Sequence, residues 1–202
     1  MGSQVETPLF ICSFPRSGGR HIRKVLNKAG KDVKQERYGP DGIVSWIHLF
    51  PGQYGGEPED RANKEVHVPD ALATVHMTRH PLGAISSAQT LTAEARRWLG
   101  QHLEIEPKNT IDFLMAAWLE WNERIEEVAD WQFCIENLEL RWEEFKQITH
   151  IPMDTEFIKL PKDEWNSREG RYFQLNWDDL KIADSDLAYI VRLKAVDYGY
   201  LV

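Results

Sequence analysis

Short apolar runs alternate with amphipathic segments along this chain. Continuous apolar runs predict strands that are buried on both faces. Such runs occupy residues 8–13, 43–47, 72–78 and 131–136. Apolar residues that recur three and four positions apart predict helices instead. This spacing occurs over residues 19–29, 82–98, 109–128, 139–149 and 183–196. The stretches 51–70 and 150–176 carry neither pattern and are expected to be loops.

The alternation of buried strands and helices predicts an α/β fold. The expected architecture is a three-layer sandwich, in which helices cover both faces of a central parallel sheet. A chain of 202 residues is long enough to bury a core, so we expect one domain over residues 1–202. In such sheets ligands bind beyond the carboxyl ends of the strands, where the loops should converge on one crevice. The long loop 51–70 is equally consistent with a lid, an acceptor-binding loop or a surface insertion.

One stripe of large apolar residues runs along the predicted helix 109–128. It consists of Leu114, Trp118, Trp121 and Ile125. Tryptophan side chains can form a stacking platform for a ligand, but residues at helical spacing usually pack into a core. We therefore predict that this stripe is buried.

The segment Leu9–Ala29 predicts an anion-binding site. It reads as a buried strand, then a turn with Ser17, Gly18 and Gly19, then an amphipathic helix. Backbone N–H groups at a helix N-terminus and the helix dipole favour a bound anion. Arg16 and Arg20 add positive charge, so the turn predicts a phosphate or sulfate site. An ordinary strand-to-helix turn rich in small residues is the alternative.

Two later segments carry further phosphate-binding residue types. The strand 72–78 is followed by Arg79, and Ser87 comes eight residues later, about two turns into the predicted helix. An arginine at a strand end offers a planar fork of donors to a phosphate, although a structural ion pair would use the same residue. Near the C-terminus, Asn166–Arg171 (NSREGR) combines arginines with a glycine.

Together these segments resemble the sulfotransferases that use 3′-phosphoadenosine 5′-phosphosulfate (PAPS). FPRSGG resembles the PRSGTT loop of that family, which identifies it as a P-loop-like strand-loop-helix. Arg79, Pro81 and Ser87 match the family's R-x-P-x-x-x-x-x-S motif, whose Arg and Ser hold the 3′-phosphate of the donor. Asn166–Arg171 resembles the late R-K-G loop, with Glu169 in place of the lysine.

The resemblance implies PAPS as co-substrate, 3′-phosphoadenosine 5′-phosphate (PAP) as product, and no metal. Arg16 would neutralise the charge that develops on the leaving PAP, and we expect it on an exposed loop tip. Gly19 and Arg20 depart from the family, which has two threonines there. The donor-binding residues implied are Arg16, Ser17, Gly18, Gly19, Arg20, His21, Arg79, Ser87, Arg168 and Gly170.

Two residues compete for the role of general base. Glu36 lies twenty residues after Arg16, near the place where tyrosyl-protein sulfotransferases have a glutamate. His48 follows the strand 43–47 in WIHLFP, which resembles the T-H-L-P of the cytosolic enzymes. Histidine titrates near neutral pH and a glutamate can be tuned by burial, so either side chain could accept a proton. A surface salt bridge for Glu36 and a strand-end hydrogen bond for His48 are the structural alternatives.

Composition limits the partners and the compartment. The net charge of −8 argues against a nucleic-acid partner. The two cysteines predict buried thiols in a reducing compartment. No apolar run approaches the length of a membrane span, and no signal peptide is expected, so we predict a cytoplasmic enzyme. The acceptor, whether a small molecule, a glycan or a peptide, and the oligomeric state stay open.

Two other functions compete with sulfuryl transfer. A P-loop small-molecule kinase would need glycine at Phe14, lysine at Arg20 and a hydroxyl at His21, where it would hold magnesium. Arg79 also stands where such a kinase would have a magnesium-binding aspartate. The second alternative is a degenerate protein that binds PAPS or PAP without turnover, which the Gly19-Arg20 departure leaves open.

Overall fold

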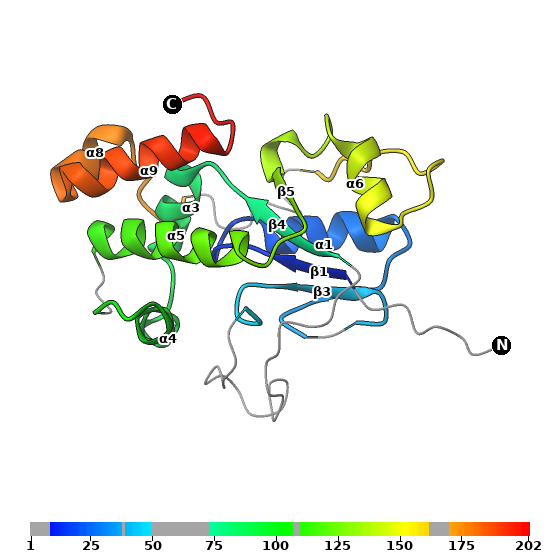
Figure 1. Cartoon of the computed structure of the whole chain (residues 1–202), viewed down its shortest axis with the longest axis horizontal. Coiled ribbons are helices and arrows are strands. Elements are labelled where there is room, and N and C mark those ends of the chain that lie inside the picture. Colours follow the sequence, from blue (N-terminus) through cyan, green and yellow to red (C-terminus); the bar gives the residue numbers. More distant parts are fainter. Residues whose placement is uncertain (1–8, 38, 50–72, 107–109, 162–169) are drawn as a thin grey trace.

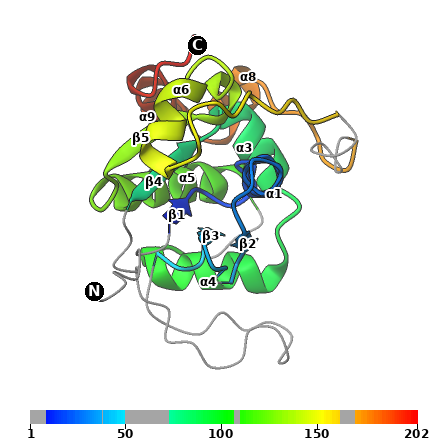
Figure 2. The same cartoon turned by 90° about the vertical axis from the view of Figure 1, so that its right-hand side faces the viewer.

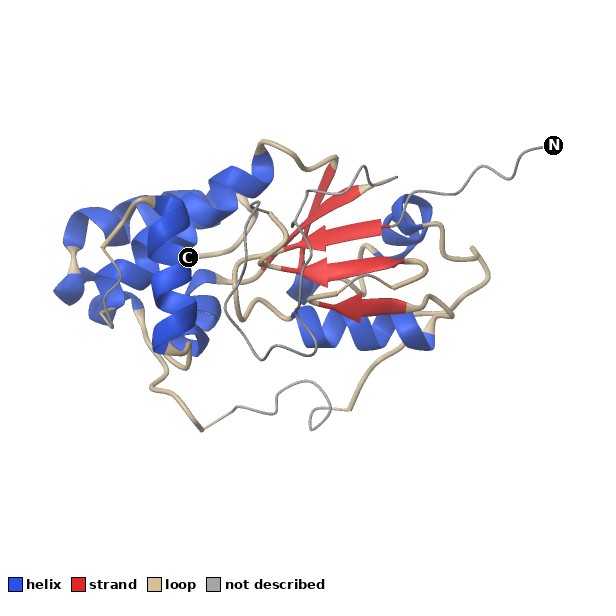
Figure 3. Cartoon of the chain, turned by 90° about the horizontal axis from the view of Figure 1, so that it is seen from below, coloured by secondary structure: helices blue, strands red, loops and turns tan. Residues whose placement is uncertain are grey.

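The structure is a computed structural model that describes residues 9–37, 39–49, 73–106, 110–161 and 170–202 (Figure 1). Its centre is a five-stranded parallel sheet in the order β2-β3-β1-β4-β5. The strands are β1 (Leu9–Cys12), β2 (Val33–Gln35), β3 (Gly42–Ser45), β4 (Thr74–Thr78) and β5 (Trp131–Cys134). Figure 3 shows them side by side with their arrowheads pointing the same way. The predicted α/β fold with a central parallel sheet is therefore confirmed.

Helices cover both faces of this sheet (Figure 1 and Figure 2). They are α1 (Gly19–Lys28), α3 (Pro81–Ala88), α4 (Ala93–Leu103), α5 (Ile111–Glu126), η1 (Ile135–Asn137), α6 (Trp142–Thr149), α8 (Trp177–Ala183) and α9 (Ser185–Asp197). Alternate residues of β1 enter two different cores. Phe10 and Cys12 pack toward α3, α4, α5 and α9. Leu9 and Ile11 pack toward α1 and α6. The architecture is thus a three-layer sandwich.

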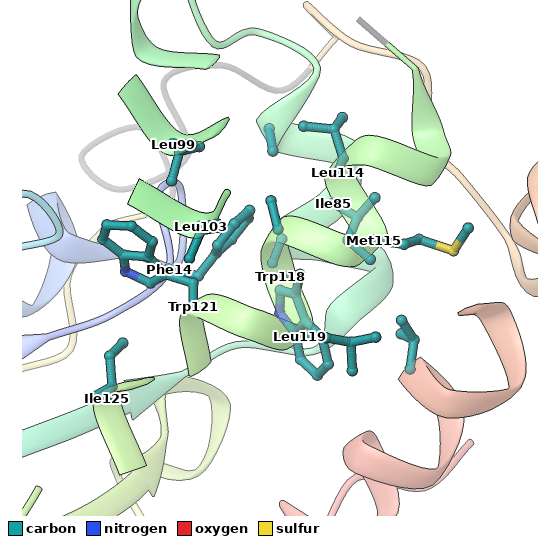
Figure 4. Close-up of a cluster of buried hydrophobic side chains, with 14 of the residues drawn as sticks. Phe14, Ile85, Leu99, Leu103, Leu114, Met115, Trp118, Leu119, Trp121 and Ile125 are labelled. Carbon is teal, nitrogen blue, oxygen red and sulfur yellow. The ribbon is translucent and has the colours of Figure 1, made fainter. Parts of the chain in front are cut away.

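The apolar stripe of α5 is buried as predicted. Leu114, Trp118, Trp121 and Ile125 are each at most 1% exposed. Figure 4 shows this stripe among Phe14, Ile85 and the leucines of α4. The tryptophans therefore belong to the core that supports the sheet.

The prediction of one helix over 82–98 is wrong in one respect, because this segment forms two helices, α3 and α4. The Thr90 hydroxyl donates to the Ser87 carbonyl at 2.8 Å and closes the end of α3. The Thr92 hydroxyl then accepts from the Ala95 N–H at 3.1 Å and caps α4. The break leaves the Thr90 carbonyl outside regular helix, which matters for the site described below.

Three elements were missed (β2, η1 and α8), and strands β3 and β5 each end two residues earlier than predicted, β5 at Cys134 because η1 begins at Ile135. The edge strand β2 (VKQ) has a single buried residue, so its sequence shows no apolar run. Helix α8 has only seven residues and is started by a capping box of Asn176 and Asp179. Strand β3 ends at Ser45, before the predicted 47, because the Ser45 hydroxyl accepts the Ile47 and His48 N–H groups and turns the chain. The loop expected over 51–70 lies outside the described residues.

Burial of His76 in β4 predicts a pH-dependent stability. Its ring is fully buried, with Nε2 2.9 Å from Asn122 Oδ1, and burial lowers the pKa from 6.5 to about 4. The unfolded chain therefore binds one proton more than the folded chain between these two pH values. We expect the free energy of unfolding to fall by about 3 kcal/mol between pH 7 and pH 4 through this residue alone.

Urea denaturation at several pH values tests this expectation against the variant His76→Gln. The variant loses the titrating group, so its stability should decline less steeply below pH 6.5. Equal slopes for the two proteins would contradict the assignment to His76.

Candidate functional site

The turn between β1 and α1 is pressed closely against its neighbours. Gly18 is the N-cap of α1, with φ 103° and ψ 15° in the left-handed region. A Cβ on Gly18 would lie 3.3 Å from the Ile135 side chain, and one on Gly19 would lie 3.3 Å from Val44. A side chain at position 19 would therefore meet the Val44 side chain closely, which favours glycine there. Glycines let this backbone approach the ends of β3 and β5.

The start of α1 retains the features of an anion site. Among the described residues, no side-chain hydrogen bond caps this end and its first turn holds no acidic residue. The helix dipole places partial positive charge at this end, which would favour a bound phosphate. The local geometry of this turn is compatible with the anion site, which stays a prediction.

Arg16 is half-buried and does not lie on an exposed loop tip, contrary to prediction. Its Nη2 donates to the Thr90 carbonyl at 3.3 Å, in the break between α3 and α4. Its own carbonyl accepts from Arg79 Nη1 at 2.8 Å. Arg16 is thus held through both its side chain and its carbonyl. The Thr90 carbonyl is available to it because this carbonyl lies in the break between α3 and α4.

Backbone strain marks two of the predicted functional residues. Four described residues other than glycine have positive φ, and two of them, Glu104 and His150, end helices. The other two are Arg16 (φ 72°) and Glu36 (φ 54°), neither of which ends a helix. A left-handed backbone costs about 1–2 kcal/mol for such residues. Strain without a capping role is a feature of functional sites.

Arg79 and Ser87 are brought to the same side of α3. The Arg79 guanidinium lies over Gly83, whose Cβ would be 3.1 Å from Nε and 3.3 Å from Nη2. Ser87 is four residues after Gly83 and therefore on the same helix face. Ser87 is 6% exposed, so little of this residue reaches solvent. Sequence reasoning missed Gly83, although a glycine four residues after an arginine was visible.

Gly83 provides a test of this arrangement. Gly83→Ala should stabilise the helix by about 1 kcal/mol, because alanine has the higher helix propensity. The new methyl group should displace the Arg79 guanidinium and weaken PAP binding severalfold. Calorimetry with PAP and urea denaturation would measure the two effects, which have opposite signs.

A double-mutant cycle separates this explanation from a general disturbance of α3. If Gly83→Ala acts through Arg79, it should have no further effect on PAP binding in an Arg79→Gln background. Additive losses would show that the methyl group disturbs something other than Arg79.

A cavity of about 500 Å³ opens beside the turn. Gly18, His21 and Arg79 line it from the predicted set. The other walls are Ile135, Glu136, Leu138, Glu139, Phe157, Lys159 and Leu160. This volume is typical of small-molecule sites. The apolar part of the wall (Ile135, Leu138, Phe157 and Leu160), together with the Arg79 cation, suits a ligand with a flat base and a phosphate. The apolar wall was not predicted, since it comes from separate residues without a motif.

Burial and neighbouring charged groups set the local electrostatics of this cavity. Burial, and then Lys24, lowers the pKa of His21, which keeps the ring largely neutral near pH 7. Glu136 accepts from the His80 N–H and from the Tyr200 hydroxyl, each at 3.0 Å. Tyr200 thus bonds the same carboxylate as the backbone N–H of His80, the residue that follows Arg79.

The remaining predicted donor residues are dispersed. Ser17 is buried at 1% exposure, and Arg20 is exposed. Gly170 is exposed, with φ 82°, and no atom of the described residues lies within 4 Å of the position of a Cβ. Arg168 lies outside the described residues. The structure thus joins the first two motifs and leaves the third untested.

A second cavity of about 770 Å³ lies between the end of α3 and the start of α5. Its walls are Gln89, Thr90, Thr110, Ile111, Leu114, Arg171, Tyr172 and Phe173. The segment that carries Phe173 is fixed to α3, because Gln89 Nε2 donates to the Phe173 carbonyl at 2.8 Å. Since Arg16 bonds both Thr90 and Arg79, it contacts a wall residue of each cavity.

The two predicted bases converge on one serine. Ser45 Oγ donates to Glu36 Oε2 at 2.5 Å and lies 2.7 Å from His48 Nδ1. Ser45 is the last residue of β3 and was not predicted as a site residue. Cys12 pairs with Ser45 in the sheet, and burial and the Glu36 carboxylate raise the pKa of its thiol well above the usual range. Cys12 is therefore a neutral thiol and not a nucleophile.

Comparisons with known proteins do not assign a family. No protein-family model matches the chain, and no curated protein sequence matches it. In the part of the chain that the structure describes, no helix is long and apolar enough to cross a membrane. The same residues contain no group of three His, Cys, Asp or Glu side chains arranged to hold a metal ion.

Proposed function

We propose that this protein is a PAPS-dependent sulfotransferase, which moves a sulfuryl group to a hydroxyl or amine acceptor. The observation that carries the proposal is the meeting of two separate motifs at one cavity. Arg79 bonds the carbonyl of Arg16 at 2.8 Å and lies over the α3 face that holds Ser87. A glycine turn, a strand-end arginine and a helix serine together suit a nucleotide with two phosphate positions.

The residues of the site fit such a donor. Backbone N–H groups at the start of α1 would hold the 5′-phosphosulfate, and Arg79 with Ser87 would hold the 3′-phosphate. The apolar walls of the 500 Å³ cavity offer space for adenine. When bound, PAPS supplies an activated sulfuryl group. Arg16 would stabilise negative charge on the departing phosphate, because its guanidinium is permanently protonated.

The second cavity is our candidate for the acceptor site. Arg16 contacts Thr90 in the wall of this second cavity and Arg79 in the wall of the donor cavity. This position supports transfer of the sulfuryl group from the donor cavity to the second cavity, past Arg16. The walls combine apolar and aromatic groups with the Arg171 cation, a mixture that suits an acceptor of mixed polarity. Both cysteines are buried and free, which supports our placing the activity in the cytoplasm.

The alternatives are weaker on chemical grounds. A P-loop kinase would need a hydroxyl at position 21, where His21 offers an imidazole. A PAP-binding protein without turnover would need the same donor cavity but no acid–base group. The Glu36–Ser45–His48 network, in which Ser45 and His48 are buried, favours an enzyme.

Two measurements test the proposal in sequence. Thermal shift with PAP, and separately with ATP and magnesium, should show stabilisation by PAP at lower concentration. Incubation with PAPS and a pool of candidate acceptors should then release PAP, detected by mass spectrometry. Stabilisation by ATP with magnesium alone would favour the kinase. PAP binding without PAP release from PAPS for any acceptor in the pool would favour the binding protein.

A further inference from the structure

The wall of the second cavity indicates the chemical class of its ligand. We propose that this cavity takes an acceptor with an anionic group, such as a carboxylate, on an aromatic or apolar body, and that Arg171 binds the anionic group. Arg171 ends the segment Asn166–Arg171 and lines the second cavity, whereas the cavity proposed for the donor is lined by Arg79. That the ligand is an acceptor rests on the proposed function, while its anionic class follows from the wall itself.

Charge in this wall is of one sign. Among the described residues that line the cavity, Arg171 is the single charged side chain, and no carboxylate accompanies it. Arg171 is exposed, and within the described residues it donates no hydrogen bond and forms no ion pair. Its guanidinium therefore offers a planar fork of donors to a ligand, and this fork matches the two oxygens of a carboxylate.

Two neutral donors lie in the same wall. Thr110 is the N-cap of α5, yet its side chain makes no capping hydrogen bond. The Tyr172 hydroxyl, like that of Thr110, makes no hydrogen bond within the described residues. A hydroxyl can donate its hydrogen to an anionic oxygen, which can only accept. Both residues therefore suit the same kind of group as Arg171.

The rest of the wall suits an aromatic or apolar body. Phe173 is 65% exposed, although side chains of this type are usually buried. A ligand ring packed against Phe173 would remove apolar surface from water, which favours binding. Arg16 contacts this wall at the Thr90 carbonyl, so a ligand hydroxyl directed toward Thr90 would lie on the side of the proposed donor. The anionic group then takes no part in the transfer and only positions the acceptor.

The backbone that follows Arg171 is fixed to α3. The Phe173 carbonyl accepts from Gln89 Nε2 at 2.8 Å, and the Leu175 N–H donates to the hydroxyl of the buried Ser86 at 2.9 Å. Both bonds lie within four residues of Arg171. A binding segment that is already held in place loses less conformational freedom when the ligand binds.

The overall charge of the chain predicts the opposite preference. A net charge of −8 attracts cations and repels anions at long range. Salt screens this attraction beyond about 10 Å, whereas a guanidinium binds a carboxylate at hydrogen-bond distance. We therefore expect Arg171 to decide the preference, so that an acid binds better than an amine of the same shape.

Three phenols of similar shape test the anionic class without any turnover. At pH 7, 4-hydroxyphenylacetate is an anion, 4-hydroxyphenylacetamide is neutral and tyramine is a cation. In saturation-transfer NMR titrations of the full chain, we expect the acid to bind about fivefold more tightly than the amide, and tyramine no better than the amide. Arg171→Gln should remove the preference for the acid. Arg97→Gln is the matched control and should retain it, because Arg97 is an exposed arginine of α4 that lines neither cavity.

Several results would overturn the assignment to Arg171. Equal binding of the acid and the amide by the wild type would do so, as would a preference for the acid that survives in Arg171→Gln. A preference that disappears when PAP is added would place the acid in the donor cavity and would also overturn it.

Turnover separates this inference from the proposed function. If the acid is preferred through Arg171 but PAPS transfers to none of the three phenols nor to any acceptor in the pool, the anion site stands and the proposed function fails. If PAPS transfers to the acid and the amide with equal kcat/KM, the proposed function stands and the anionic class is wrong.

Discussion

Replacing Arg79 with glutamine should weaken PAP binding by about 2–3 kcal/mol while leaving AMP binding nearly unchanged. AMP lacks the 3′-phosphate, so it does not need the charge of Arg79. The glutamine retains polar atoms over Gly83, where the guanidinium lies within 3.1 Å of a Cβ position. Isothermal calorimetry with both nucleotides would measure the difference.

A matched variant separates a local phosphate contact from the general charge of the cavity. Lys159 also lines the donor cavity, but its side chain is 82% exposed. Lys159→Gln removes the same charge from a screened position and should change PAP binding little. Equal loss of PAP and AMP in Arg79→Gln would show that Arg79 serves the shape of the turn, through its bond to the Arg16 carbonyl, and not the 3′-phosphate.

The sheet could be predicted, and the two candidate phosphate-binding motifs could be proposed, because their signals are local. β1, β3 and β4 are short apolar runs, and a parallel sheet brings the ends of such strands together without further information. Arg79 and Ser87 are separated by a fixed helical distance, so their common face follows from the spacing. Edge strand β2 escaped prediction because one buried side chain leaves no periodic signal.

The parts that could not be predicted depend on contacts between distant segments. Ser45 looks like an ordinary strand residue until the structure places Glu36 and His48 on either side of it. The role of Gly83 cannot be recognised in the sequence, because it depends on the Arg79 guanidinium lying over this glycine in the fold. The break at Thr90 overrides a continuous helical pattern through one hydroxyl bond, and it is this break that offers a carbonyl to Arg16.

Arg16→Asn should lower kcat a hundredfold or more, with a much smaller change in the Kd for PAP. A cation that stabilises the leaving group acts on the transition state more than on the bound donor, and loss of such a group usually costs a factor of 10²–10³. Asparagine suits this test because it tolerates a left-handed backbone such as φ 72° better than alanine does. The variant therefore removes the charge without adding strain to the turn.

Arg16→Lys is the companion variant, which retains the charge and loses the planar fork. Partial activity in Arg16→Lys and little in Arg16→Asn would show that charge matters most, because the bond from Nη2 to the Thr90 carbonyl can be rebuilt by a lysine amine. Steady-state kinetics at a fixed acceptor concentration would separate kcat from KM. An unchanged kcat with a raised KM for PAPS in Arg16→Asn would make Arg16 a binding residue only. The leaving group would then have to be stabilised by the N–H groups of the turn and the dipole of α1, which act at the same end of the donor.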